Sequence, residues 1–241
     1  MNKENIFNIN NNKMIIPLSK TDGIFINLRK YKVWEPNLSK VIKEKHKLFK
    51  IDTFIDIGAH IGYYTLLLAK NTNNVYSFEP NINNYNLLKN NIELNNFTNC
   101  NIFNIGLSNT IEQLTFYYNN LKSGHGSFNK ETANINKLNL EKQIDVNILD
   151  NIDILGDNIM IKIDIEGHEY NCLNGMIKLL ETKKIKVLII EISRKFYGID
   201  HEKEILTFIK KYFNNLYIVN QSKYLDLTNL PNLNQYDLCC Y

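Results

Sequence analysis

A glycine turn between an apolar strand and a helix is the feature that most constrains the fold of this chain. Residues 53–57 form a short apolar run typical of a buried strand, and residues 61–70 have the apolar spacing of a helix. An Asp-x-Gly-x-x-x-Gly turn at residues 56–62 joins them, and a second apolar run, residues 74–78, ends on Glu79. Strand, glycine turn, helix, strand and acid together indicate the nucleotide-binding half of a Rossmann-like fold.

The spacing of the glycines indicates which nucleotide binds. Gly-x-Gly-x-x-Gly, the fingerprint of a site for a dinucleotide pyrophosphate, is absent from this turn. An Asp-x-Gly-x-x-x-Gly turn with a later acid resembles the S-adenosylmethionine (SAM) site of class I methyltransferases. The sequence therefore predicts SAM as the cofactor and methyl transfer as the reaction.

Composition limits the class of protein and its partners. The chain has 241 residues, of which 44% are apolar, and this suits one domain with a sizeable core. A formal net charge of +3 is too small to indicate nucleic acid or a membrane as a partner. We see no signal peptide and no apolar run long enough to span a membrane, so we expect a cytoplasmic protein. The four cysteines lack metal-binding spacing and are expected to be buried thiols.

The order of the expected elements predicts the architecture. Strands and helices alternate from residue 53, which favours a Rossmann-like class I methyltransferase fold. In this α/β fold we expect a mainly parallel central sheet with an antiparallel C-terminal strand and helices on both faces. Residues 1–50 would form an N-terminal extension and helix packing on the core, and residues 51–241 the methyltransferase domain. Residues 1–13 are expected to be frayed, and residues 119–139 to form a loop inserted within the domain.

The individual elements are predicted as follows. Strands are expected at residues 23–28, 53–57, 74–78, 100–105, 114–118, 144–149, 159–164, 187–192, 216–219 and 236–240. Helices are expected at residues 34–47, 61–70, 82–94, 168–180 and 201–213.

Ligands of a parallel α/β sheet bind at the carboxyl ends of its strands, so residues at these ends are the candidates for the cofactor site. Gly58 and Gly62 would let the backbone approach the ligand, next to unpaired N–H groups at the helix start. Asp56 would order the loop or meet the SAM ammonium group, and Glu79 would accept bonds from both ribose hydroxyls. The alternatives are an ordinary strand–helix turn and a surface acid. The predicted cofactor-binding residues are Asp56, Gly58, Ala59, Gly62, Thr65, Glu79, Pro80, Asn104 and Gly106.

A second polar segment, Lys-Ile-Asp-Ile-Glu-Gly-His-Glu at residues 162–169, follows another apolar strand. Asp164 and Glu166 are two residues apart, so they share one face or edge, where an acid would lie near the transferred methyl group. His125, flanked by two glycines in a loop, is a candidate for the base that removes the acceptor proton. Helix capping and an ordinary loop residue are the alternatives. The predicted catalytic residues are Asp164, Glu166 and His125.

Glu191 ends the strand that follows this segment, and with Asp164 it could hold a divalent metal ion. Two acids without an obvious third ligand are a weak metal signature. The sequence therefore predicts no metal site.

Five segments in order resemble the FkbM family of SAM-dependent methyltransferases, and the resemblance extends from about Trp34 to Tyr241. It implies a class I fold and O-methylation of a hydroxyl on a sugar, glycan, lipid or secondary metabolite. Many relatives carry Asn at the position of His60 and a small residue at His168, so these histidines are not assigned catalytic roles. The segments are residues 54–65, 78–80, 106–108, 149–150 and 162–169.

Two other functions stay open from the sequence. RNA 2′-O-methyltransferases often use a Lys-Asp-Lys-Glu set, which Lys162, Asp164 and Glu191 match in part, but such an enzyme should also show a basic face. A non-catalytic SAM-binding module should have lost some of Asp56, Glu79 and Asp164, and all three are present.

Overall fold

The computed structural model describes residues 5–241 as an α/β structure built around an eight-stranded sheet. The strand order is β12-β11-β13-β10-β9-β3-β4-β5, and the strands from β10 to β5 are parallel. These strands are β3 (Thr53–Ile57), β4 (Asn74–Phe78), β5 (Cys100–Phe103), β9 (Ile159–Ile163), β10 (Ile185–Ile192), β11 (Leu216–Ile218), β12 (Lys223–Tyr224) and β13 (Tyr236–Cys240). The predicted fold class is confirmed.

The chain crosses the sheet in two directions from β3. It runs outward through β4 to β5 on one side, and later returns to place β9 and β10 on the other side. The carboxyl ends of β3 and β9 therefore flank the topological switch point, where ligands of such sheets bind. The last strand, β13, pairs antiparallel with both β10 and β11, which confirms the predicted antiparallel C-terminal strand.

Helices cover both faces because the inner strands bury side chains on both sides. Phe54 of β3 and Met160 of β9 face one core, which includes residues of α1, α2, α3 and α4. Ile55 and Ile161 face the opposite core, which includes residues of α6, α7 and α8. The helices are α1 (Gly23–Tyr31), α2 (Pro36–Leu48), α3 (Tyr63–Ala69), α4 (Ile82–Leu94), α5 (Lys130–Asn136), α6 (Glu169–Asn174), α7 (Ile177–Glu181) and α8 (Arg194–Lys210).

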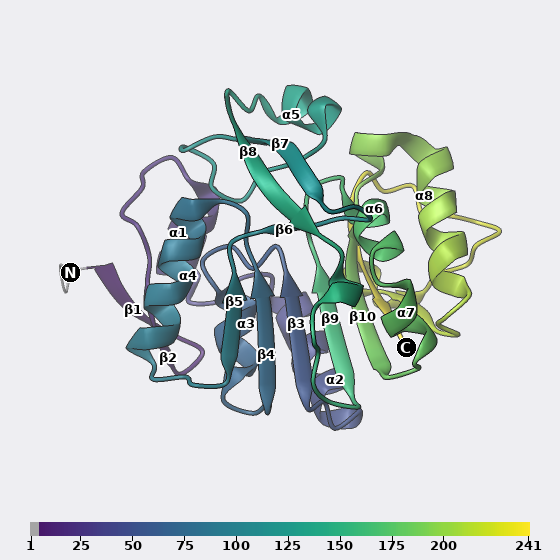
Figure 1. Cartoon of the computed structure of the whole chain (residues 1–241), viewed down its shortest axis with the longest axis horizontal. Helices are drawn as coiled ribbons and strands as arrows, with labels where there is room; N and C mark the ends of the chain where they lie inside the picture. The colour runs from purple at the N-terminus through teal and green to yellow at the C-terminus, as the bar shows by residue number, and fades with distance from the viewer. Residues whose placement is uncertain (1–4) are drawn as a thin grey trace.

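A second, three-stranded sheet lies above the central sheet in the view of Figure 1, together with α5. It contains β6 (Gly106–Leu107), β7 (Glu112–Tyr118) and β8 (Leu140–Asn147), in the order β6-β8-β7. The sequence predicted its two longer strands, although β8 begins earlier than expected and Leu149 lies in a short 3₁₀ turn. The loop predicted at residues 119–139 was wrong in part, because it contains α5, whose first N–H groups are capped by Asn129.

Two predictions near the N-terminus were wrong. The strand expected at residues 23–28 is part of α1, which begins where the Asp22 side chain accepts bonds from two backbone N–H groups. The segment expected to be frayed contains a hairpin of β1 (Ile6–Ile9) and β2 (Asn12–Ile15). The Asn91 side chain accepts a 2.6 Å bond from the Ile15 N–H and so ties this hairpin to α4. The part of that prediction concerning residues 1–4 lies outside the described residues.

Two helices differ from their predicted bounds by more than two residues, whereas α2 and α3 differ by one or two residues at each end. The helix expected at residues 168–180 is divided into α6 and α7 at Gly175, where a Cβ would lie 1.9 Å from the carbonyl oxygen of Ser108. The helix expected at residues 201–213 begins earlier, at Arg194, and contains a non-helical residue, Gly198. The predicted domain division at residue 50 stays a prediction. Within residues 5–241, no helix combines the length and apolarity that crossing a membrane requires.

Candidate functional site

The turn after β3 brings the backbone close to the end of β9. Gly58 has a φ of +81°, and a Cβ placed on it would lie 2.0 Å from the carbonyl oxygen of Asp164. Gly62, at the start of α3, has a φ of +91°, and its Cβ would lie 2.6 Å from the Leu88 side chain. Both positions therefore require glycine, for a left-handed backbone and for close packing. Gly58 allows the end of β3 to pack against the end of β9, and Gly62 allows α3 to pack against α4.

Asp56 and Thr65 lie beneath this turn. Asp56 is 1% exposed, and its Oδ2 accepts a 2.7 Å bond from the Thr65 hydroxyl. Burial raises the pKa of Asp56, while the Lys162 charge opposes that shift. Asp56 Oδ1 is buried without a hydrogen-bond partner among residues 5–241. Asp56 and Thr65 support the turn and are not among the residues that line the cavity described below.

Glu79 follows β4 and faces the same turn. Its Oε2 accepts a 2.8 Å bond from the His60 N–H, and its Oε1 accepts a 2.9 Å bond from the Asn81 N–H. The residue is 5% exposed, and burial raises the pKa of Glu79 to about 7 despite these bonds. Asn104 does not line the cavity, but its amide donates to the carbonyl oxygens of Glu79 and Pro80 at 2.8 and 3.0 Å. Asn104 thus holds the segment that carries Glu79.

A cavity of about 350 Å³ opens at the carboxyl ends of β3, β4 and β9. Its volume lies in the range typical of small-molecule sites, roughly 300–1,000 Å³. The cavity brings together both predicted groups of residues, those for the cofactor and those for catalysis. The predicted residues that line it are Gly58, Ala59, Glu79, Pro80, Gly106, His125, Asp164 and Glu166.

Lys162 is the one polar residue of β9 and lines the cavity. The side chain is 3% exposed, and its Nζ lies 2.9 Å from Asp164 Oδ2. Burial lowers the pKa of Lys162, but the charges of Asp164 and Asp56 outweigh burial, and the net pKa is above its usual value. Lys162 is therefore a buried cation that holds Asp164 in place.

Glu166 sits in a left-handed conformation, with a φ of +52°, in the turn that follows β9. Its backbone carbonyl accepts a 2.6 Å bond from the Ser127 hydroxyl, and its Oε1 lies 3.2 Å from His125 Nδ1. Glu169 fixes the turn, because its Oε1 accepts a 3.0 Å bond from the Gly167 N–H. This arrangement brings His125, predicted from a loop, against Glu166, predicted from a strand end.

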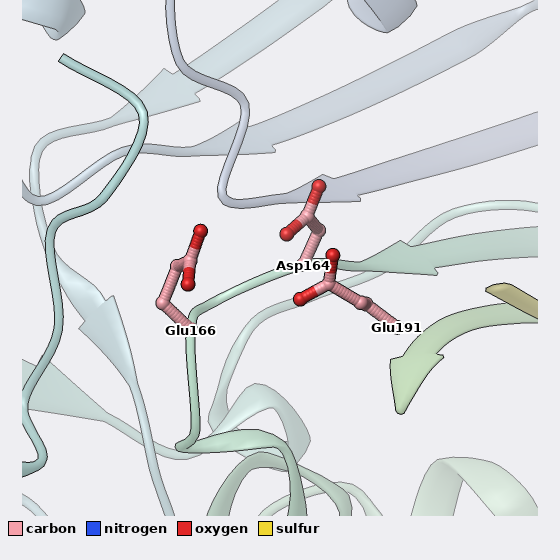
Figure 2. Close-up of side chains that lie close together, drawn as sticks. All are labelled: Asp164, Glu166 and Glu191. Atoms are coloured by element: carbon pink, nitrogen blue, oxygen red, sulfur yellow. The ribbon is translucent and has the colours of Figure 1, made fainter. Parts of the chain in front are cut away.

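Glu191 joins this pair from the neighbouring strand. Figure 2 shows the carboxyl groups of Asp164, Glu166 and Glu191 pointing toward one another. One oxygen of each lies within 4.8 Å of the others. Burial, followed by the charges of Asp164 and Glu166, raises the pKa of Glu191 well above its usual value.

Sequence reasoning missed two residues that line the cavity, Asp22 and Ser123. Asp22 Oδ2 accepts bonds from both the N–H and the hydroxyl of Ser123, each at 2.7 Å. The Ser123 Oγ also lies 2.7 Å from His60 Nε2, and burial lowers the pKa of His60 to about 4. This network joins α1, the loop before α5 and the turn after β3. The Asp22 capping position was the available sequence signal, but the link to Ser123 spans 101 positions.

The comparisons with known proteins agree with the fold and with the predicted family. The sequence model of the methyltransferase FkbM domain matches residues 56–217. No curated protein matches the chain.

Many solved structures are similar to this chain, and they include the following three. An FkbM methyltransferase from Methylobacillus flagellatus is 18% identical with a TM-score of 0.52, over 79% of this chain and 44% of that one. A Streptococcus mutans methyltransferase in complex with S-adenosylhomocysteine (SAH) is 17% identical with a TM-score of 0.45, over 83% and 96% of the two chains. A tRNA methyltransferase from M. jannaschii is 14% identical with a TM-score of 0.44, over 98% and 55%.

This chain spans less than half of the M. flagellatus protein, and the likeness between the two structures concerns the fold. The family model, in contrast, covers well over half of this chain, from Asp56 to Tyr217, and includes the glycine turn, Glu79 and the segment that ends β9. The chain therefore belongs to the FkbM methyltransferase family, and residues 56–217 lie in its SAM-dependent methyltransferase domain.

Proposed function

We propose that the protein transfers a methyl group from SAM to a hydroxyl of a sugar, glycan, lipid or secondary metabolite. The observation that carries this proposal is the shared cavity, which Glu79 lines from β4 and His125, Asp164 and Glu166 line near the end of β9. Glu79, a carboxylate suited to bind ribose hydroxyls, thus lines the same cavity as the His125–Glu166 pair, which is suited to remove a proton from an acceptor hydroxyl.

The chain's own residues fit SAM on the side of the cavity formed by β3 and β4. Glu79 Oε2 accepts one backbone N–H and retains a lone pair for a ribose hydroxyl, whereas Oε1 accepts the Asn81 N–H and, at 3.5 Å, the Asn84 amide. Gly58, Ala59 and Gly106 line the wall beside it. Asp56 Oδ1 is buried and unpartnered among the described residues, and when Asp56 is ionised it places a negative charge beneath the turn, which suits a cationic ligand.

The residues near the end of β9 supply what a hydroxyl acceptor needs. SAM, when bound, supplies a methyl group on a sulfonium, and its transfer to an oxygen leaves the neutral thioether SAH. His125 would take the proton that the hydroxyl loses, and Glu166 would stabilise the imidazolium across their 3.2 Å contact. A base so placed contributes about 10²–10⁴-fold to the rate. Asp164, held by Lys162, would orient the acceptor beside it.

Incubation with SAM and a panel of hydroxyl compounds tests the proposal, with mass spectrometry to detect methyl ethers. The expected result is a methylated sugar, glycan, lipid or secondary metabolite, with turnover reduced about 10²–10⁴-fold by His125→Ala. Binding of SAH without product on any acceptor would indicate a non-catalytic module instead. Methylation of RNA ribose alone would support the nucleic-acid alternative. The affinity of the protein for RNA should then fall steeply as the salt concentration rises.

A further inference from the structure

Three acidic side chains converge where β9 and β10 end, since Asp164 and Glu166 follow β9 and Glu191 lies near the end of β10. One oxygen from each of Asp164, Glu166 and Glu191 lies within 4.8 Å of the other two. Figure 2 shows that the three carboxyl groups meet between the strand ends. The sequence predicted no metal because it paired only Asp164 with Glu191, and the turn after β9 adds Glu166 as a third oxygen donor.

Glu166 provides a second and independent indication of a ligand. Its side chain is 10% exposed, and its Oε1 is engaged by His125 Nδ1. Its Oε2 is fully buried and has no hydrogen-bond partner among residues 5–241. A buried carboxylate oxygen without a partner is costly, so this oxygen is suited to a ligand that the protein itself does not supply.

The partners of the other two acids orient them without completing their charge balance. Glu191 Oε2 accepts a 2.9 Å bond from the Ser193 hydroxyl, and its Oε1 accepts a bond from the Gln235 amide. Both donors are neutral. They orient the Glu191 carboxylate in the way that hydrogen bonds from neighbouring residues orient the ligands of metal sites. Among residues 5–241, Lys162 is the only Lys or Arg that forms an ion pair with one of these three acids, and its partner is Asp164.

We propose that Asp164, Glu166 and Glu191 bind one hard divalent cation, of the kind of Ca²⁺, Mn²⁺ or Mg²⁺. The donor set consists of carboxylate oxygens, which these cations prefer. Two oxygens bound to one Ca²⁺ lie at most roughly 4.6–5.2 Å apart, so three oxygens within 4.8 Å of one another are close enough to share this ion. Around Mg²⁺ this greatest separation is roughly 4.0–4.2 Å.

The cation would also define the class of acceptor, and this step rests on the proposed function. Asp164, Glu166 and Glu191 all line the cavity, so a cation held by them has its open positions toward that space. Acceptors that chelate with two neighbouring oxygens, such as a vicinal diol of a sugar, suit such a site. His125 contacts Glu166 and stays available as the base rather than as a ligand.

Calorimetric titration of EDTA-treated protein with CaCl₂, and separately with MnCl₂ and MgCl₂, tests the site directly. The expected result is one bound cation per chain and a rise in the thermal unfolding midpoint with at least one of these ions. Glu166→Gln and Glu191→Gln should each weaken cation binding at least tenfold. Because the variants keep the size of the side chain, SAH binding by each shows that it is folded.

Glu79→Gln is the matched control, since Glu79 is another acid on the same cavity but is placed toward the proposed cofactor side. It should weaken SAH binding and leave cation binding unchanged. Wild-type protein that binds SAH but shows no cation binding would overturn the cation site and leave the proposed function standing. Wild-type protein that binds the cation but not SAH would instead overturn the proposed function. Equal losses of cation binding in Glu79→Gln and the cluster variants would overturn the assignment of the ligands.

Discussion

Glu79 combines two properties that oppose each other in a buried carboxyl group. Two backbone N–H groups stabilise its charge, but burial dominates and raises the pKa of Glu79 to about 7. The proposed role requires the ionised form, because a carboxylate accepts stronger hydrogen bonds from ribose hydroxyls than a neutral carboxyl group does. The protonation state of one side chain should therefore control cofactor affinity near neutral pH.

Glu79→Gln tests this control through pH. Below its pKa Glu79 is protonated, so wild-type affinity for SAH should fall as the pH drops from 8 to 6. The Gln side chain is neutral throughout, so the variant should bind about 1–3 kcal/mol more weakly at pH 8 and change little with pH. Calorimetry at pH 6, 7 and 8 measures both curves. Parallel curves would show that another group causes the pH dependence.

Asp164 is expected to act on turnover rather than on cofactor affinity. It lies at the end of β9 with its carboxyl group beside those of Glu166 and Glu191, whereas Glu79 follows β4. Asp164→Asn should therefore reduce kcat more than it reduces SAM affinity, which comparison of turnover with SAH titration measures. Equal losses in both would reassign Asp164 to cofactor binding.

At the scale of elements, the sequence predictions failed where a single polar side chain determines the secondary structure. The residues of α1 form a short apolar run that strands and helices share, and Asp22 as its N-cap selects the helix. Asn10 and Asn11 adopt positive φ values in the turn between β1 and β2, which Asn tolerates in hairpins. The sequence did not single out these two asparagines as turn residues, because Asn occurs throughout the chain. The apolar runs of β3 and β4 were predicted at their observed bounds.

Gly58 joins two such elements, and its replacement should disrupt both. Gly58→Ala places a Cβ against the Asp164 carbonyl at a positive φ, so we expect unfolding to become about 2–4 kcal/mol easier and SAH binding to weaken. Gly23→Ala is the control, because Gly23 lies in α1 with no atom within 4 Å of its Cβ position. It should change stability by less than about 1 kcal/mol, and toward greater stability. Urea unfolding compares the variants, and similar losses in both would contradict the packing argument.

The link through Ser123 should hold α1 and the loop before α5 closed over the cavity. Ser123→Ala removes the hydroxyl that joins Asp22 to His60, so SAH should dissociate about 5–10-fold faster. Trp34, the single tryptophan, lines the cavity and provides a fluorescence signal for stopped-flow measurement. The Ser123→Thr variant retains a hydroxyl, so SAH should dissociate from it about as slowly as from the wild-type protein. An unchanged rate in Ser123→Ala would show that the network does not restrain the ligand.

At the scale of the whole molecule, the cavity draws its walls from distant parts of the chain. The sequence identified the walls near β3, β4 and β9, because local motifs at strand ends carry them. It did not identify the wall formed by Asp22, Trp34 and Ser123 as one surface, because only the folded chain brings these residues together. The meeting of Glu166 with Glu191 was missed for the same reason, since it depends on the pairing of β9 with β10.

The central claim is that this cavity binds SAM, and calorimetric titration of the protein with SAH tests it most directly. Asp56→Ala is the control, because it removes the buried carboxylate beneath the turn without changing a residue that lines the cavity. We expect one site with micromolar affinity, on the order of −8 kcal/mol, and its loss in the variant. Folded wild-type protein that binds no SAH would contradict the claim.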